Sequence, residues 1–206
     1  YCSPYHQNSA FHPAIEQLER ALRFEKLDKP AQKLDKLESV LSDLELASDE
    51  FAYLLAVLLS LPTEGRYPPR ELTPQKLRAK TLGAVVTVIE AMAAQRPVLM
   101  AVEDLHWIDP STQELVDQLI ERSRSARILV VITFRPESTA PWSGHAHVTA
   151  HTLNNLGRRD CAALISGVTG GKDLPDEVRK QIVAQTDGVP LFVEELTKTV
   201  LESGLL

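Results

Sequence analysis

Residues 98–109 read VLMAVEDLHWID, an unbroken apolar run followed by two adjacent carboxylates, Glu103 and Asp104. A second apolar run, residues 128–134, is rich in β-branched side chains, and neither run alternates with polar residues. Such runs are typical of strands buried on both faces of a parallel sheet. We therefore expect two neighbouring parallel strands, with the carboxylates at the edge where the strands' carboxyl ends meet and where α/β sheets bind ligands.

A helix-start signal separates the two runs. Asp109 can cap a helix that begins at Pro110, because an aspartate before a first-turn proline accepts hydrogen bonds from free backbone N–H groups. The order strand, helix, strand predicts a βαβ unit. The fold class expected for this part of the chain is α/β.

Helical patterns fill the rest of the chain. Four helices are predicted before the βαβ unit, and Ser48 and Thr73 are the expected caps of the third and fourth. Three more are predicted after it, at about 157–167, 175–186 and 190–203. The α/β pattern ends near residue 153, which predicts a partial α/β lobe over residues 1–152, with a helical insertion at about 25–95, and a small helical lobe over residues 153–206.

Composition excludes several classes of function. The 22 basic and 28 acidic residues give a formal net charge of −6 without a lysine-rich or arginine-rich block, so this segment carries no nucleic-acid footprint. Cys2 and Cys161 form no CxxC or Cys/His cluster, which fits a reducing cytosol and predicts two buried side chains rather than a disulfide or zinc site. The longest apolar run, residues 51–61, is about half of the roughly 20 residues that a membrane span needs. We expect a cytoplasmic protein without membrane contact.

The acidic pair at the end of the first strand indicates phosphoryl-transfer chemistry. One carboxylate there can hold Mg²⁺ while the other orients the water that attacks a γ-phosphate, which is the pattern of a Walker B motif. The alternative is structural, because many strands of α/β proteins end in an acidic residue that merely caps the next turn.

Longer strings carry a resemblance to a known family. EDLHWIDPST, followed by a helix and the strand RILVVITFRPE, resembles the P-loop ATPase modules of the STAND signalling class, which are AAA-like ATPase domains of bacterial regulators, often fused to adenylate or guanylate cyclase domains. Residues 2–18 resemble the segment after that family's second strand, and GVPLFVEEL at 188–196 resembles its GxP motif. The resemblance covers essentially the whole chain. It implies an incomplete P-loop NTPase-type parallel sheet followed by a small all-helical lid.

The resemblance also implies roles for individual residues. Glu103 stands at the Mg²⁺ position, Asp104 at the water-orienting position and Arg135 at the sensor position that reads the γ-phosphate. Pro190, with Gly188 in the same motif, would lie near the adenine of ATP. Because many relatives have aspartate where Glu103 stands, either carboxylate could be the metal ligand. Position alone leaves structural alternatives: Arg135 paired to a nearby carboxylate such as Glu137, and Pro190 as an ordinary first-turn proline.

A phosphate-binding loop is absent from these 206 residues. ATP binding in this class depends on a GxxxxGK[ST] string, and none occurs. In the family that loop follows the first strand, upstream of the segment that resembles residues 1–18. We therefore expect that the chain alone neither binds ATP tightly nor hydrolyses it, although the parent protein would bind ATP with Mg²⁺. An absent first strand would also leave an open edge beside the strand at 128–134, so oligomerisation is possible.

The expected function is that of a nucleotide-dependent switch. ATP bound between the α/β lobe and the lid would change their orientation and act on an attached effector or cyclase domain. The alternative is a non-catalytic protein–protein interaction scaffold, with a vestigial nucleotide site and leucine-rich helices at 11–60 that contact partner proteins. An ordinary enzyme that merely shares a parallel sheet, for example a hydrolase, is disfavoured, because the sequence has no GxSxG elbow and no glycine-rich dinucleotide fingerprint.

Overall fold

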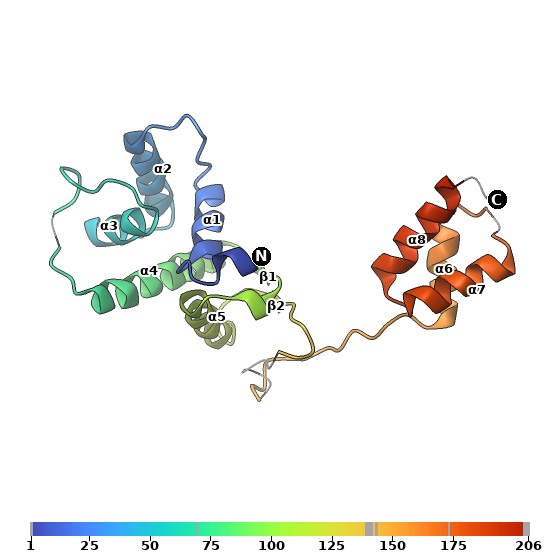
Figure 1. The fold of residues 1–206 in the computed structure, drawn as a ribbon. Helices are drawn as coiled ribbons and strands as arrows, with labels where there is room; N and C mark the ends of the chain where they lie inside the picture. Colours follow the sequence, from blue (N-terminus) through green and yellow to red (C-terminus); the bar gives the residue numbers. More distant parts are fainter. Residues whose placement is uncertain (1, 69, 139–141, 143, 173, 204–206) are drawn as a thin grey trace. The chain divides into compact units, whose positions relative to one another are not determined.

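The chain divides into two compact units, residues 1–142 and 143–206, in the computed structural model (Figure 1). The structure describes residues 2–68, 70–138, 142, 144–172 and 174–203. The elements of the first unit are η1 (Pro4–His6), α1 (His12–Ala21), α2 (Pro30–Asp43), α3 (Asp49–Leu58), α4 (Pro74–Gln95), β1 (Val98–Val102), η2 (Leu105–Trp107), α5 (Pro110–Arg122) and β2 (Ile128–Ile132). Those of the second are α6 (Arg158–Val168), α7 (Asp176–Thr186) and α8 (Pro190–Glu202).

A two-stranded parallel sheet forms the α/β part of the first unit. β1 pairs with β2 in register, with Val98 opposite Ile128 and Val102 opposite Ile132, and α5 connects them. The predicted parallel pair and βαβ unit are therefore confirmed. The unit is mostly helical with a small parallel sheet, which is compatible with part of a P-loop NTPase-type fold.

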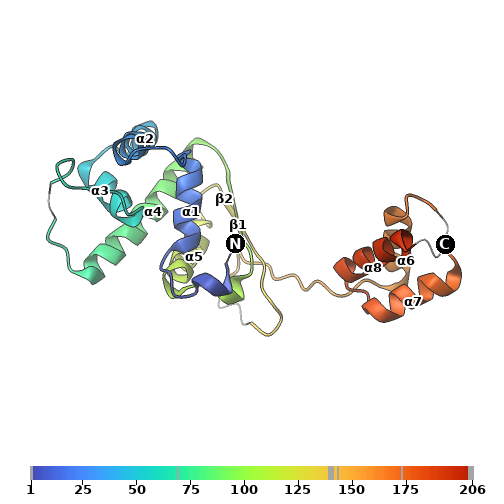
Figure 2. The same cartoon turned by 45° about the horizontal axis from the view of Figure 1, so that its top comes forward.

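The expectation that both strands are buried on two faces is wrong. Leu99, Leu129 and Val131 are exposed by 68%, 62% and 46%, whereas Val102 and Ile128 on the opposite face are buried. The reason is that helices cover only one face, since α4 contacts β1 and α5 contacts β2 (Figures 1 and 2). An apolar strand sequence shows that a face can be buried. It does not show that a covering layer lies among the same residues.

A large hydrophobic core packs the helices of the first unit together. The leucine stripe predicted in the second helix is buried at Leu34, Leu37 and Leu41, against α3. Met100 of β1 packs against the same core. The helix starts follow the sequence signals, because Ser48 Oγ accepts the N–H of Phe51 at 3.2 Å and Thr73 Oγ1 accepts that of Lys76 at 3.3 Å, which confirms both predicted caps.

The second unit is a three-helix cluster around its own small core. The residues at its centre are buried and come from all three helices and the α6–α7 connection: Cys161, Ile165, Leu174, Ile182 and Val193. Both cysteines of the chain are free and buried, as the sequence predicted. Among the described residues, no helix is both long and apolar enough to cross a membrane.

Gly188 joins the α7–α8 turn to the start of the unit. Its φ is +71°, in the region that favours glycine, and its carbonyl oxygen accepts the N–H of Leu156 at 2.7 Å. A Cβ at this position would lie 2.3 Å from the Leu156 carbonyl oxygen, well inside contact distance. The GxP motif therefore has a structural requirement for glycine here, whatever else it does.

A charged cluster ties the 62–73 connection to α2. Arg66 donates to both carboxylate oxygens of Glu38, at 2.9 and 2.6 Å, and Tyr67 Oη donates to Glu38 at 2.8 Å. These hydrogen bonds, with Arg66 the larger cause, hold the pKa of Glu38 below its usual range. A lowered folded-state pKa stabilises the fold above the unfolded-state pKa, and this stability is lost as pH falls through the folded-state value.

We expect Gly188→Ala to destabilise the second unit. The left-handed conformation costs alanine about 1–2 kcal/mol and the clash with Leu156 about 1–3 kcal/mol more. The measurement is urea unfolding followed by circular dichroism. Gly167→Ala is the matched control, because Gly167 lies in α6 with nothing near its would-be Cβ, so alanine there is expected to stabilise the helix by about 0.5–1 kcal/mol. Equal midpoints for Gly188→Ala and wild type would contradict the strained geometry.

We also expect Glu38→Gln to make the free energy of unfolding less dependent on pH in the acidic range. The variant should be less stable than wild type at pH 7, and the difference should shrink as pH falls from about 5 to 3, because protonation of Glu38 removes the same interaction in wild type. Thermal unfolding across this pH range tests it, with Glu71→Gln, on an exposed side chain, as control. A difference that stays constant with pH would show that the ion pair is not the cause.

Candidate functional site

The acidic pair leaves the sheet through a turn fixed by β2. Asp104 has a left-handed backbone (φ 56°), and its N–H donates to Thr133 Oγ1 at 3.2 Å. The next N–H, of Leu105, donates to the Thr133 carbonyl at 2.9 Å, and the Thr133 N–H donates to Val102 at 3.0 Å. Thr133 thus fixes the path of the chain on both sides of the two carboxylates. Thr133 is not among the site residues predicted from the sequence, although its place near the end of an apolar run is a usable signal.

A segment far away in sequence also holds the strand end. The N–H of Cys2 donates to the Glu103 carbonyl at 2.8 Å, which places residues 2–6 beside the carboxyl end of β1. Burial raises the pKa of the Cys2 thiol, and the carboxylates of Asp109 and Asp104 raise it further. The thiol is therefore protonated at neutral pH and acts as a small packed side chain rather than as a nucleophile.

The side chains of Glu103 and Asp104 are exposed and free of ion pairs and hydrogen bonds to the described residues. Their oxygens suit Mg²⁺, which proteins commonly bind through one or two carboxylates together with phosphate oxygens and water. The described residues contain no group of three or more His, Cys, Asp or Glu placed to hold a metal ion. The donor set therefore fits a Mg²⁺ shared with a phosphate ligand rather than a closed protein site.

Arg135 follows β2 at the same edge of the sheet. Because β1 and β2 are parallel and in register, the chain leaves both strands on the side where Glu103 and Asp104 lie. The Arg135 side chain is exposed, and its Cζ lies 5.9 Å from the centre of the Trp107 ring. Within the described part of the chain, the ion pairs do not include Arg135, so the alternative pairing with Glu137 is not formed.

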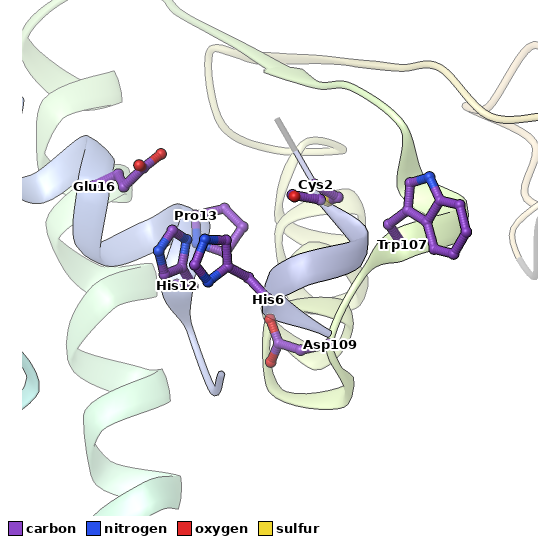
Figure 3. Close-up of a pocket in the computed structure, with 8 residues that line it drawn as sticks. Cys2, His6, His12, Pro13, Glu16, Trp107 and Asp109 are labelled. Carbon is purple, nitrogen blue, oxygen red and sulfur yellow. The ribbon is translucent and has the colours of Figure 1, made fainter. Parts of the chain in front are cut away.

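A small pocket lies behind this edge, between η1, α1 and η2 (Figure 3). Its volume of about 30 Å³ has room for a water molecule but not for a nucleotide. The residues that line it are Cys2, Ser3, His6, His12, Pro13, Glu16, Trp107 and Asp109. The rings of His6 and His12 stack face to face, with centroids 3.6 Å apart and planes 11° from parallel. The residues around this pocket therefore pack beside the carboxyl end of β1 and help to hold it in place.

Asp109 is the buried carboxylate among these residues. Its Oδ1 accepts the N–H groups of Ser111 and Thr112, both at 3.0 Å, which confirms the predicted cap of α5. The same oxygen accepts the N–H of Phe11 at 3.3 Å, where the backbone is left-handed (φ 60°) at the start of α1. The sequence predicted the cap but not the second bond, which joins positions 98 residues apart.

His106 has no chemical partner that the structure shows. Both ring nitrogens are buried and form no hydrogen bond with the described residues, and the ring centre lies 5.1 Å from that of Trp107. Packing rather than hydrogen bonding therefore holds the imidazole.

Gly188 and Pro190 belong to the second unit. Pro190 is the first residue of α8, after the Gly188 turn, so the structure gives both a local role at a helix start. A role toward adenine stays a prediction. The structure thus brings Glu103, Asp104 and Arg135 to one edge of the sheet in the first unit, whereas the GxP motif lies in the second unit.

Comparison with known proteins agrees with this picture at the level of the family. A family model described as "AAA ATPase domain" matches residues 1–132, which is more than half of the chain. An uncharacterized protein of Rhizobium meliloti (strain 1021) is 29% identical over 160 residues, which cover 75% of this chain and 15% of that protein. The chain therefore spans a small part of the length of this relative. No solved structure matches the chain at a significant level.

We expect Asp109→Ala to destabilise the first unit by about 2–4 kcal/mol. Loss of the cap costs about 1 kcal/mol, and leaving buried donors unpaired about 1–3 kcal/mol more. Urea unfolding measures the change, and Asp43→Ala, at an exposed position at the end of α2, is the control that should stay within about 0.5 kcal/mol of wild type. Equal effects of the two substitutions would mean that the hydrogen bonds of Asp109 to the starts of α1 and α5 do not stabilise the first unit.

Proposed function

The chain belongs to the AAA ATPase domain family over residues 1–132, and from that premise we propose that it is part of an ATP-dependent signalling switch of the STAND type. The observation that carries the proposal is the common edge of the sheet. Parallel pairing of β1 and β2 brings Glu103, Asp104 and Arg135 there, and the two carboxylates have no partner in the described chain. Exposed acidic oxygens at the carboxyl edge of a parallel sheet suit a nucleotide phosphate site.

In the proposed mechanism the three side chains divide the work. One carboxylate of the pair holds Mg²⁺, and the other orients a water molecule toward the γ-phosphate. Bound Mg²⁺ would neutralise phosphate charge. Arg135 contacts the γ-phosphate and thereby distinguishes ATP from ADP. Thr133 and Cys2 contribute by fixing the backbone at Glu103 and Asp104, so that only the two side chains must adjust when the ligand binds.

Binding of ATP needs a phosphate-binding loop that these 206 residues do not contain. We propose that a GxxxxGK[ST] loop of the longer parent protein completes the site, and that the chain by itself neither binds nor hydrolyses ATP. The exposed apolar face of β1 and β2 supports this view, because Leu99, Leu129 and Val131 need a covering layer.

The switch would act through the helical unit. We propose that α6–α8 form the lid, with Gly188 and Pro190 near the adenine, and that nucleotide exchange alters the lid's position and signals to an attached effector, such as a cyclase domain, in the cytoplasm. The division into two compact units and the GVPLFVEEL string support this assignment.

Equilibrium binding of a fluorescent ATP analogue with Mg²⁺ tests the proposal. The comparison is between this chain and a version of the parent protein that includes the phosphate-binding loop. We expect binding at about micromolar concentration only for the longer protein. Asp104→Asn should leave affinity within about threefold and lower hydrolysis at least about 100-fold, because it removes a group that acts mainly in the transition state. Glu103→Gln should weaken the Mg²⁺-dependent part of binding.

The control is Glu71→Gln, an exposed acid outside the site, which should change neither quantity. Tight MgATP binding by the 206-residue chain that is lost on changing Glu103 and Asp104 would overturn the view that the loop is required. Absence of binding by both proteins would instead favour the non-catalytic scaffold.

A further inference from the structure

Arg135 is exposed, yet its backbone is fixed on both sides. Upstream, the hydrogen bonds of Thr133 to Val102 and Leu105 hold the end of β2 against η2. Downstream, the Arg135 carbonyl accepts the N–H of Ser138 at 2.9 Å, which closes a turn. The position of the guanidinium group therefore depends on the side chain and on what that side chain contacts.

The contact that the structure shows is the indole of Trp107. The guanidinium Cζ lies 5.9 Å from the ring centre, within the range of a cation–π interaction. Two carboxylates lie at the same edge, but the described ion pairs include neither of them with Arg135. Arg135 thus rests on the aromatic ring, and Glu103 and Asp104 keep free oxygens.

Trp107 itself is well fixed. Its backbone N–H donates to the Asp104 carbonyl at 2.9 Å, which closes the η2 turn that directly follows the acidic pair. Its side chain is half-buried and lines the pocket with Cys2 and Asp109 (Figure 3). The indole also packs against the ring of His106, with ring centres 5.1 Å apart. A ring held by the backbone and by neighbours on one side offers a stable platform to a flexible arginine.

We propose that Trp107 is the positioning residue for Arg135: its ring holds the guanidinium at the carboxyl edge of the sheet and off the acidic pair. The consequence for the site rests on the proposed ATPase function. Without the ring, Arg135 is free to pair with Glu103 or Asp104, which would neutralise the carboxylates and take the arginine out of reach of a γ-phosphate.

The contact can be measured in this chain by acrylamide quenching of tryptophan fluorescence. The chain has two tryptophans, and Trp142 is 95% buried, so the quencher reaches mainly Trp107. A cation–π contact at an exposed site favours the covered ring by roughly 2- to 5-fold, so Arg135→Gln should raise the quenching constant about 1.5- to 2-fold. The control is Arg96→Gln, on an exposed arginine at the other end of β1. An unchanged quenching constant in Arg135→Gln would overturn the proposal.

The second arm uses ATP hydrolysis by the parent protein that includes the phosphate-binding loop. Trp107→Leu should lower kcat roughly 10- to 100-fold with a nearly unchanged Kd for MgATP, because a misplaced arginine fails mainly in the transition state. Trp107→Phe keeps an aromatic face and should recover most of the lost rate. A Leu variant as active as wild type, or equal losses in the Leu and Phe variants, would refute positioning by the ring.

The two arms separate this inference from the proposed function. A wild-type parent protein that does not hydrolyse ATP refutes the function and, with it, the role of the contact in catalysis, while the quenching result still decides whether Trp107 holds Arg135. Hydrolysis by wild type with no effect of Trp107→Leu refutes the inference alone.

Discussion

The first unit depends on the hydrogen bonds that the buried carboxylate of Asp109 accepts. With one side chain it caps α5 and holds the left-handed backbone of Phe11 at the start of α1. Because α5 connects the two strands, this bond ties the N-terminal segment to the βαβ unit. Residues 2–11 bring Cys2 to the Glu103 carbonyl, so the hydrogen bond that fixes the backbone at Glu103 also depends on how Asp109 holds this segment.

Helices cover only one face of the two-stranded sheet, and hydrogen bonds from other segments fix the carboxyl ends of its strands. Helices α4 and α5 cover one face, and the other presents Leu99, Leu129 and Val131 to solvent. Exposed apolar side chains in a row mark surfaces that pack against something else. The carboxyl end, in contrast, is closely organised by hydrogen bonds from Thr133 and Cys2, although its two acidic side chains form no hydrogen bond or ion pair with the described residues. Fixed backbone with free carboxylates is what a ligand site requires, because a preorganised site needs little rearrangement when the ligand binds.

Glycine in the GxP motif shows how a family motif can have a structural cause. The resemblance assigns Gly188 and Pro190 to nucleotide binding, and the structure shows that Gly188 is required in any case by its positive φ and by the approach of Leu156. The two requirements do not exclude each other. Pro190 likewise starts α8 and remains a candidate for adenine contact.

The sequence by itself determined the local elements and the acidic edge. Caps at Ser48, Thr73 and Asp109, the leucine stripe of α2 and the two apolar runs each predicted what the structure contains, because these signals act within a few residues along the chain. Only the tertiary structure decided which face of the sheet is covered, that Asp109 reaches Phe11, that Thr133 and Cys2 hold the strand end, and that Trp107 lies beside Arg135. These contacts join positions from 28 to about 100 residues apart, and a linear pattern carries no information on which distant backbone groups meet once the helices pack.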